Sequence, residues 1–361
     1  MMLLILLAIP LLVAAVGFFL SKGKLNWLEA LVQAAAGMLL MGGGYMAARY
    51  VKTTDVEIWN GRIASKDFGE QGCCHSYSCN CIPVCSSDGK GNTSCHDVCS
   101  TCYRHSHDLY WSAKTTNGEV VVNDTCNPPS SFPPEEWKRI SIGDPTAIEH
   151  MYINYIKGLP GKFFRRPWLV DKYRSKLPAY PRVHGHSVNR FLMTVLGESI
   201  PDVTNLEKRL AELNADLGRV RQVNIIVVVT GEKSSEYVDA LAEAWLGGKK
   251  NDLIVVVGVP TFPNIEWVKV ISWTDVREVR DGIEQRVARM GDFNGDRLLS
   301  IVRDEAGSKF QRRHMGDFRY LLKEIEPPMW AFLLLATLGL LVSGGLQAWF
   351  WSRNPFGRRF R

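Results

Sequence analysis

Cysteine is missing from most of this 361-residue chain, since residues 1–72 and 127–361 contain none. A strong net charge is missing as well: the formal value is only +6, and the charges are spread along the chain. Nucleic-acid binding usually shows as a concentrated basic region, so we expect no nucleic-acid partner. The sequence also lacks a nucleophile elbow, a phosphate-binding loop and an HExxH helix, so it offers no recognisable catalytic motif.

Charged residues are nearly absent from three long apolar segments, which run from Met2 to Leu20, from Trp27 to about Ala48 and from Met329 to Trp351. As a helix, each segment is long enough to cross a hydrocarbon core of about 30 Å. The first segment lacks the basic start and the cleavage site of a signal peptide, so we interpret it as a retained span. The sequence therefore predicts an integral membrane protein with three transmembrane helices in the lipid bilayer.

Basic residues flank these spans unevenly. Lys22 and Lys24 occupy the loop between the first two spans, and cytoplasmic loops are enriched in such residues. Arg49 and Lys52 follow the second span and count against this orientation, but the tail from residue 352 favours it with four arginines: Arg353, Arg358, Arg359 and Arg361. We therefore expect residues 49–328 on the periplasmic side of a bacterial inner membrane, or on the outer side of a phage or host envelope.

The cysteines gather in one segment, which indicates a small module that depends on covalent cross-links. In an oxidising compartment we expect four disulfides and one free thiol, with a connectivity that spacing leaves open. The nine residues are Cys73, Cys74, Cys79, Cys81, Cys85, Cys95, Cys99, Cys102 and Cys126.

Zinc is the alternative for this segment, because thiolates and imidazoles occur there at short spacing. A cytosolic location would favour zinc, whereas the outer side favours disulfides and makes the histidines ordinary surface residues. The candidate ligands are Cys79-x-Cys81, Cys99-x2-Cys102-x2-His105-x-His107, His75 and His96.

Strand patterns surround the cysteines. Residues 56–63 indicate a strand and a turn, and residues 108–113 lead through Asn117-Gly118 into a second run, residues 119–122. Asn-Gly between alternating runs is a strong hairpin signal. We therefore expect residues 49–135 to form a module of β-strands and loops, outside the two spans of residues 1–48.

A basic and aromatic connector follows, over residues 136–194. Its prolines argue against one continuous helix. One interpretation is a surface that binds the membrane or a partner, because cations suit phosphate headgroups and aromatic rings suit the interface. The other is a linker whose cations are solvated. The residues concerned are Lys162, Arg165, Arg166, Trp168, Lys172 and Arg174.

Residues 195–326 alternate between helical and strand patterns. Thr204 to Glu207 is typical of a capping box, and a helix should continue to about Gly218. The runs at residues 223–230 and 253–259 predict buried strands, and residues 265–271 predict an edge strand. Helices are expected at residues 234–246, along the stripe from Val276 to Val287, and from Leu298 to about Ile325. This order predicts an α/β sandwich.

These residues resemble the TPM domain family, found in thylakoid-lumen phosphatase-like and photosystem repair proteins, bacterial membrane-anchored relatives and an animal receptor-assembly factor. The resemblance rests on VNIIVVVT, on residues 244–257 (AWLGGKKNDLIVVV) and on Gly316-Asp317-Phe318. It implies an α/β sandwich outside the membrane, roles in assembly or repair of membrane complexes, and acid phosphatase activity in some members. The family's glycine-rich acidic stretch is replaced here by residues 272–295. With the runs EIWNGRIASK, HSYSCNC and TCYRHSH, the whole chain also loosely resembles uncharacterised tailed-phage membrane proteins.

Asp292, Asn294 and Asp296 place three oxygen side chains at alternate positions, as in the first half of a calcium loop. Arg297 stands where that loop needs glycine, and Arg303 stands where it needs glutamate. The alternative is therefore a plain turn between helices. The TPM resemblance implies a divalent ion beside acidic loop residues and so supports calcium.

These features favour a binding and scaffolding function. In this interpretation the outer-side TPM-like domain helps to organise or assemble a membrane or envelope complex, which could belong to a phage. The partner would be a membrane or envelope protein. Gly44-x3-Ala48 and Gly339-x3-Ser343 indicate close helix packing, between the spans or in a homo-oligomer. The alternative is a metal-dependent phosphatase of the TPM type. The domain plan ends with the third span, residues 329–351, and a basic cytoplasmic tail, residues 352–361.

Overall fold

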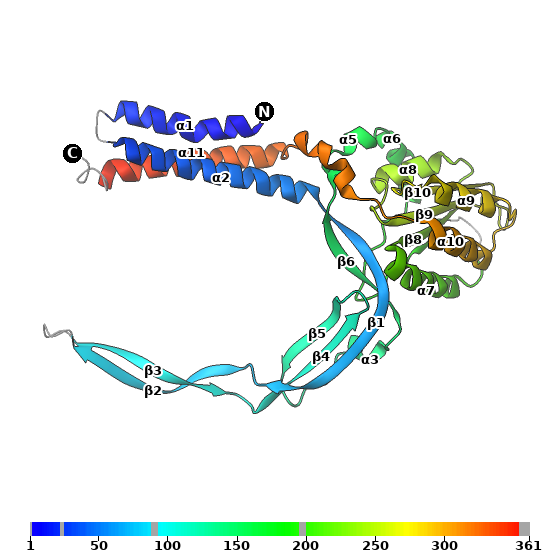
Figure 1. Cartoon of the computed structure of the whole chain (residues 1–361), viewed down its shortest axis with the longest axis horizontal. Coiled ribbons are helices and arrows are strands. Elements are labelled where there is room, and N and C mark those ends of the chain that lie inside the picture. Colours follow the sequence, from blue (N-terminus) through cyan, green and yellow to red (C-terminus); the bar gives the residue numbers. More distant parts are fainter. Residues whose placement is uncertain (1, 22–24, 88–92, 195–199, 354–361) are drawn as a thin grey trace. The chain divides into compact units, whose positions relative to one another are not determined.

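The computed structural model describes residues 2–21, 25–87, 93–194 and 200–353. These residues form two compact units, and Figure 1 labels their helices and strands. The smaller unit combines residues up to 56 with residues 151–165 and the chain from residue 314 onward. The larger unit contains residues 57–150 and 166–313.

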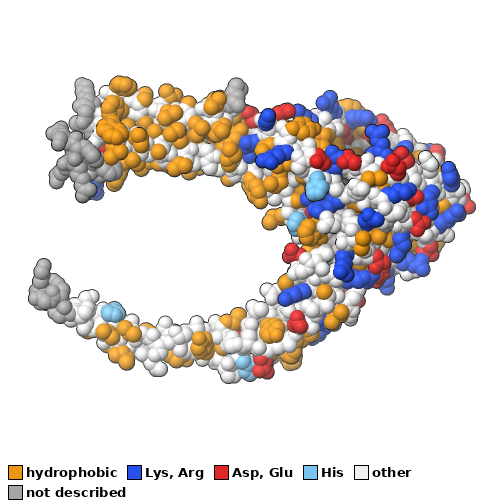
Figure 2. Space-filling view, in the orientation of Figure 1, with side chains coloured by type: hydrophobic (Ala, Val, Ile, Leu, Met, Phe, Trp, Pro, Cys, Tyr) orange, Lys and Arg blue, Asp and Glu red, His pale blue; other side chains and the backbone are white. Residues whose placement is uncertain are grey.

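Three long helices make up most of the smaller unit: α1 (Met2–Leu20), α2 (Trp27–Thr53) and α11 (Met329–Arg353). All three are long and apolar enough to cross a membrane, which confirms the predicted spans. Most of their side chains face outward and cover the bundle with hydrophobic surface (Figure 2). Such a continuous apolar surface is suited to lipid. Of the predicted flanking cations, Lys22, Lys24, Arg358, Arg359 and Arg361 lie outside the described residues.

Small residues let these helices approach closely. A Cβ atom added to Gly37 of α2 would lie 2.4 Å from Pro10 Cβ of α1 and 3.0 Å from Ser343 Oγ of α11. A Cβ atom on Gly44 would lie 2.3 Å from Leu335 of α11. Close backbone approach is the usual role of small residues between membrane helices. Two of the small-residue faces that the sequence predicts, those of Gly44 and Ser343, therefore pack inside this chain.

Short helices accompany the spans in the smaller unit: α4 (Tyr155–Gly158), α5 (Pro160–Phe163) and the 3-10 helix η2 (Met315–Lys323). Lys157 Nζ donates a hydrogen bond of 2.7 Å to the carbonyl of Thr54. Lys52 Nζ donates one of 2.9 Å to the carbonyl of Glu326. Cations in the last turn of α2 and in α4 therefore bind backbone carbonyl groups of this unit.

A four-stranded sheet with the order β5-β4-β1-β6 begins the larger unit. Its strands are β1 (Thr54–Gly72), β4 (His107–Thr115), β5 (Val120–Asn127) and β6 (Pro145–Ile153), and the short helix α3 (Glu135–Arg139) lies between the last two in sequence. Ile63, Ala113, Val122 and Ile140 form a small core. The predicted hairpin is confirmed, because Asn117 and Gly118 lie between β4 and β5 and Gly118 has a φ of +84°.

The turn predicted within residues 56–63 is wrong, since all of them, Asn60 and Gly61 included, lie inside β1. Turn propensity is a local preference, and here a buried partner for the amide overrides it. The Asn60 side chain forms hydrogen bonds with groups of the α/β domain.

Strands β2 (Ser76–Ser87) and β3 (Thr93–Tyr103) form a separate two-stranded antiparallel sheet, here called the ribbon. Its register shifts between Cys79 and Ile82, where Asn80 adopts a left-handed conformation with a φ of +48°. This is the geometry of a β-bulge, in which two residues oppose one. The ribbon confirms that the cysteine-rich segment is built from strands.

The α/β domain has a second four-stranded sheet with the order β10-β9-β8-β7. Strands β7 (Phe191–Thr194), β8 (Asn224–Thr230) and β9 (Asp252–Gly258) are parallel, and β10 (Trp267–Ser272) is antiparallel at the edge. Helices α7 (Val203–Arg221), α9 (Arg277–Ala288) and α10 (Gly295–Lys309) cover one face. Helices α6 (Pro167–Tyr173) and α8 (Glu236–Ala244) cover the other, and the 3-10 helix η1 (Arg174–Lys176) follows α6.

Both faces of this sheet are buried, which explains its continuous apolar runs. Val227 and Val229 of β8 pack toward α7, α9 and α10, whereas Ile226 and Val228 pack toward α6 and α8. The predicted α/β sandwich is therefore confirmed, with its strands and helices within a few residues of their expected bounds.

Two details of the predicted α/β segment are wrong, and two strands lie where the sequence predicted none. Helix α7 begins after Asp202, not with a capping box at Thr204, because the carboxylate of Glu207 accepts hydrogen bonds from the backbone N–H groups of Arg190 and Phe191. The helical region expected from Leu298 divides into α10 and η2. Strands β6 and β7 fall inside the expected connector, and β7 is too short, at four residues, to show a periodic pattern.

Candidate functional site: the ribbon and the cluster at its base

Eight of the nine cysteines form four disulfides: Cys74–Cys126, Cys79–Cys102, Cys81–Cys99 and Cys85–Cys95. Cys73 keeps a free thiol and is buried. The expected count of four cross-links and one thiol is therefore confirmed, and the pairing excludes a zinc site made from the ribbon cysteines. Three of the disulfides join β2 to β3, and the fourth ties the start of the ribbon to the end of β5.

The ribbon has two chemically different faces. Ile82 lies opposite Val98 and Val84 lies opposite His96, whereas Cys85 lies opposite Cys95. Because side chains alternate between the faces of a strand, Ile82, Val84 and Val98 share one face, and the disulfides at residues 81–99 and 85–95 share the other. We name the first the apolar face.

The apolar face is open to solvent. Ile82 is 67% exposed and Val98 is 50% exposed. The described part of the ribbon carries a single carboxylate, at Asp97, and no lysine or arginine. By contrast, charged side chains crowd the surface of the α/β domain (Figure 2). Exposed branched side chains on a strand pair with a single charged residue are typical of a surface that another chain covers.

A cluster of four side chains lies at the base of the ribbon: Cys73, His75, His105 and Asp108. Cys73 and His75 lie in the short link between β1 and β2, His105 lies in the turn between β3 and β4, and Asp108 lies in β4. Pairing of Gln71 with Asp108, and of Gly72 with His107, brings these segments together. The cluster therefore depends on the register of β1 and β4.

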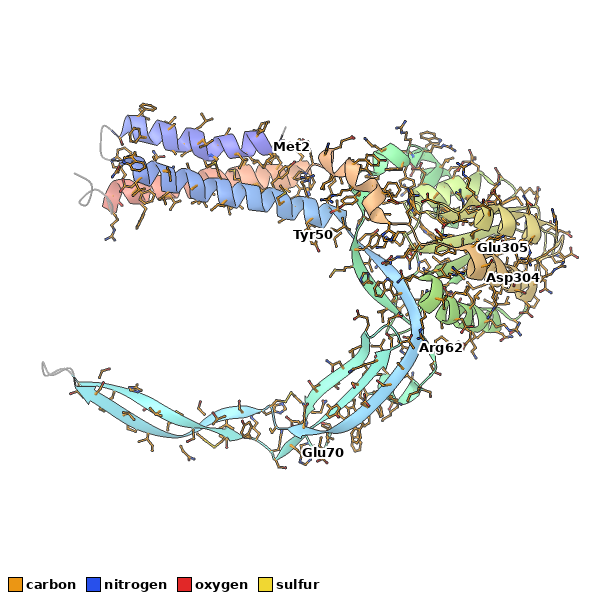
Figure 3. All side chains as sticks on the ribbon, in the orientation of Figure 1. Met2, Tyr50, Arg62, Glu70, Asp304 and Glu305 are labelled. Carbon is orange, nitrogen blue, oxygen red and sulfur yellow. A yellow bond between two sulfur atoms is a disulfide. The ribbon has the colours of Figure 1, made fainter. Side chains whose placement is uncertain are left out.

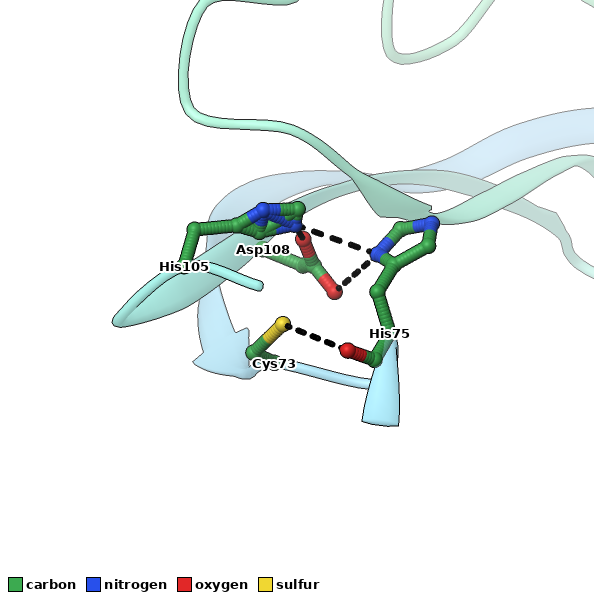
Figure 4. Close-up of side chains that lie close together, drawn as sticks. All are labelled: Cys73, His75, His105 and Asp108. Atoms are coloured by element: carbon green, nitrogen blue, oxygen red, sulfur yellow. Dashed lines mark hydrogen bonds and ion pairs between the residues drawn. The ribbon is translucent and has the colours of Figure 1, made fainter. Parts of the chain in front are cut away.

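The donor atoms of the cluster lie within 4.8 Å of one another. His75 Nδ1 is 3.1 Å from Asp108 Oδ2, and His105 Nε2 is 2.9 Å from Asp108 Oδ1 (Figure 4). The two ring nitrogens are 3.2 Å apart. The Asp108 side chain is 0% exposed. Burial raises the pKa of Asp108, but the Cys74 N–H group and the two imidazoles outweigh it and hold that pKa below its ordinary value.

A buried polar network joins β1 to the α/β domain. Asn60 Nδ2 donates to the Val223 carbonyl at 3.0 Å and to Asn224 Oδ1 at 3.2 Å, and the guanidinium of Arg190 donates to Asn60 Oδ1. Asn251 Nδ2 donates to the carbonyl of Ile58 at 2.7 Å. Satisfied buried polar groups of this kind fix one arrangement of the packed segments. The sheet that carries the ribbon is therefore held firmly on the α/β domain.

Charges in and around this network are perturbed by burial. Burial lowers the pKa of Arg190 to about 10 and raises the pKa of Asp252 to about 6. Arg62, which Figure 3 labels on β1, forms ion pairs of 2.6 and 2.7 Å with Glu212 and Asp216 of α7. The exposed pairs contribute little free energy, so the buried amides carry most of the specificity.

The predicted calcium residues lie near the start of α10. Asn294 Oδ1 accepts a hydrogen bond of 2.9 Å from the Arg297 N–H group and so caps the helix. Asp296 forms an ion pair with Arg209. The residue facing Asp292 in an isolated bridge is Asn264. Calcium binding here stays a prediction, although two of its three side chains already have partners within the chain.

Most of the predicted membrane-surface cations face carboxylates. Lys162 pairs with Glu324, Arg166 with Asp239, Lys172 with Glu236 and Arg174 with Asp171. Helix α6 also buries Leu169 and Tyr173 in the α/β core. Arg165 and Trp168 are exposed. This surface stays a prediction, while the packing of α6 shows that part of the connector belongs to the α/β fold.

Sequence reasoning missed the cluster because its members come from separate turns. Its disulfide interpretation made His75 and His105 ordinary surface or turn residues, and its zinc alternative grouped them with the ribbon cysteines. Both instead face the buried Asp108. The available signal was the ninth cysteine, Cys73, which has no disulfide partner and lies two residues from His75. Searches of protein-family models, curated proteins and solved structures found no match to this chain. The TPM resemblance therefore stays a prediction.

Proposed function

We propose that this chain is a membrane-anchored binding protein that uses the apolar face of its ribbon to hold a membrane or envelope protein on the oxidising side of the membrane. The three spans provide the anchor, and the α/β domain provides the rigid support. The cross-linked, exposed ribbon is the observation that carries this proposal.

The ribbon is stabilised in a way that burial cannot account for. An isolated two-stranded sheet is at best marginally stable in water. The loops closed by Cys85–Cys95 and Cys74–Cys126 span sequence separations of 10 and 52 residues. Taken singly, closing them removes chain entropy worth about 3 and about 4 kcal/mol in the unfolded state. The disulfides therefore keep a strand pair ordered while both of its faces stay accessible.

The apolar face provides the surface that a bound partner would bury. Full burial of a valine or isoleucine side chain contributes about 1.5 to 3 kcal/mol. Ile82, Val84 and Val98 lie together on a support that loses little further entropy on binding, because the cross-links have already removed it. A ribbon whose described residues include a single carboxylate and no lysine or arginine also suits an apolar contact better than an electrostatic one.

Site-directed photo-cross-linking in native membranes tests the proposal. A photoreactive residue at Val84 should join the chain to a specific membrane or envelope protein, and the double variant Ile82→Thr/Val98→Thr should reduce that product by at least about tenfold. Threonine keeps the β-branched shape and the strand propensity. The matched control is Val220→Thr on α7, where the side chain is 73% exposed.

The control variant should leave the product unchanged. A product that survives the double variant, or that forms equally from a photoreactive residue at Val220, would contradict the proposed role of the apolar face. A cross-linked homodimer that disappears with the double variant would identify the partner as a second copy and would exclude the hetero-complex proposed here.

A further inference from the structure

The cluster at the base of the ribbon contains a contact pattern that hydrogen bonds cannot satisfy. His75 Nδ1 lies 3.1 Å from Asp108 Oδ2, His105 Nε2 lies 2.9 Å from Asp108 Oδ1, and the two ring nitrogens lie 3.2 Å apart. A ring nitrogen carries either a proton or a lone pair. If both nitrogens donate to the carboxylate, two N–H groups face each other. If either is deprotonated, its lone pair faces a carboxylate oxygen.

The Asp108 carboxylate also lacks a hydrogen-bond donor for one of its oxygens. Oδ2 of Asp108 accepts a hydrogen bond of 2.7 Å from the Cys74 N–H group. Oδ1 is buried and accepts no hydrogen bond from the described residues, although His105 Nε2 lies 2.9 Å away. A buried carboxylate oxygen without a donor is costly. A cation between Asp108 and the two imidazoles would use all three lone pairs at once.

The donor set identifies the cation. Tetrahedral zinc binds imidazole nitrogen at about 2.0 to 2.1 Å, which places two such nitrogens about 3.3 Å apart. The observed separation is 3.2 Å. Sulfur from Cys73 adds a soft ligand, whereas calcium and magnesium take oxygen ligands almost exclusively. We propose that Cys73, His75, His105 and Asp108 bind one zinc ion.

Four protein ligands would fill the tetrahedron and leave no open position, which is typical of a structural zinc site. Such a site would join the β1–β2 link, the turn after β3 and strand β4. It would therefore fix the base of the ribbon where the cross-strand disulfides end. It would also hold the one cysteine without a disulfide as a metal-bound thiolate.

Metal analysis of the full-length protein in detergent tests this proposal. The protein is stripped with a chelator without reductant, mixed with an equimolar amount of zinc, desalted and measured by mass spectrometry of the metal. Wild type should retain one zinc per chain. His105→Ala should weaken retention by at least about 100-fold, since loss of a group that only supports a ligand already costs about 10- to 100-fold.

The matched control is His107→Ala. His107 lies two residues away, and its Nδ1 is 2.9 Å from the hydroxyl of Ser106. Cys73→Ser provides a second variant that changes one atom, and a count of four intact disulfides verifies that each variant has folded. In cobalt-substituted protein, wild type and His107→Ala should show a thiolate-to-cobalt charge-transfer band that Cys73→Ser lacks. Absence of retained zinc in wild type, equal retention in His105→Ala, or a charge-transfer band in Cys73→Ser would overturn the proposal.

Discussion

Gly218 lies in helix α7, and its replacement by alanine should lower the stability of the protein, the opposite of the usual effect in a helix. Exchange of glycine for alanine inside a helix normally stabilises by about 1 kcal/mol, because alanine restricts the unfolded chain and favours the helix. At Gly218, however, an added Cβ would lie 2.5 Å from Asn60 Cβ and 2.6 Å from the Asn60 carbonyl oxygen of β1. Backbone atoms cannot rotate away, so the clash must move β1 or the helix.

The net effect follows from these two contributions. Overpacking of this kind costs about 1 to 3 kcal/mol, and a backbone clash belongs near the upper end. After the helix gain is subtracted, Gly218→Ala should destabilise the larger unit by about 2 kcal/mol. For a unit of this size, that change lowers the melting temperature by about 4 to 8 °C.

Gly307 of α10 is the matched control. A Cβ atom there would have its nearest neighbour at Leu217 Cδ2, 3.5 Å away, which is an ordinary contact. Gly307→Ala should therefore raise the melting temperature by about 2 to 4 °C. Thermal unfolding of full-length protein in detergent, followed by tryptophan fluorescence, measures both variants. If Gly218→Ala melts at or above the wild-type temperature, the close packing of β1 against α7 is refuted.

Other predictions concern charge, metal, thiols and topology. Burial raises the pKa of Asp252 to about 6, above its value in the unfolded chain, so the ionised carboxylate destabilises the fold above that pH. Acidification from about pH 7 to about pH 5 should therefore stabilise wild type relative to Asp252→Asn, and parallel pH profiles of the melting temperature would refute this. Millimolar calcium should raise the melting temperature of wild type but not of Asp292→Ala/Asp296→Ala; equal shifts would leave that segment as a turn. Alkylation of denatured, chelator-treated and unreduced protein should label one cysteine, Cys73, and more labelled sites would contradict the four disulfides. Protease added outside the sealed membrane should digest residues 49–328 and spare the tail, and protection of that block would reverse the orientation.

The sequence by itself determined the elements whose signals are local. Length and apolarity were enough for the three spans, because a helix must cover the hydrocarbon thickness. Continuous valine and isoleucine runs were enough to predict β8 and β9, and Asn117-Gly118 was enough to predict the hairpin. The cysteine count, read together with the expected outer-side location, was enough to predict four disulfides and one thiol.

Tertiary structure decided the features that depend on which segments meet. Asn60-Gly61 has turn chemistry, yet it stays in β1 because the amide of Asn60 finds buried partners near Arg190 and Val223. Glu207 has capping-box spacing, yet its carboxylate binds the backbone at the start of β7. In both cases the local preference of one side chain is weaker than the hydrogen bonds that the same side chain forms with a distant segment.

The cluster at the base of the ribbon depends on distance in space in the same way. His75 and His105 are separated by 30 residues. Only the register of β1 against β4, with Gln71 opposite Asp108, brings their rings onto one carboxylate. A shift of that register by one residue would turn Asp108 to the other face of the sheet and separate the ligands. Cysteine spacing along the chain identified the cysteine-rich segment, and strand pairing decided which of its side chains meet.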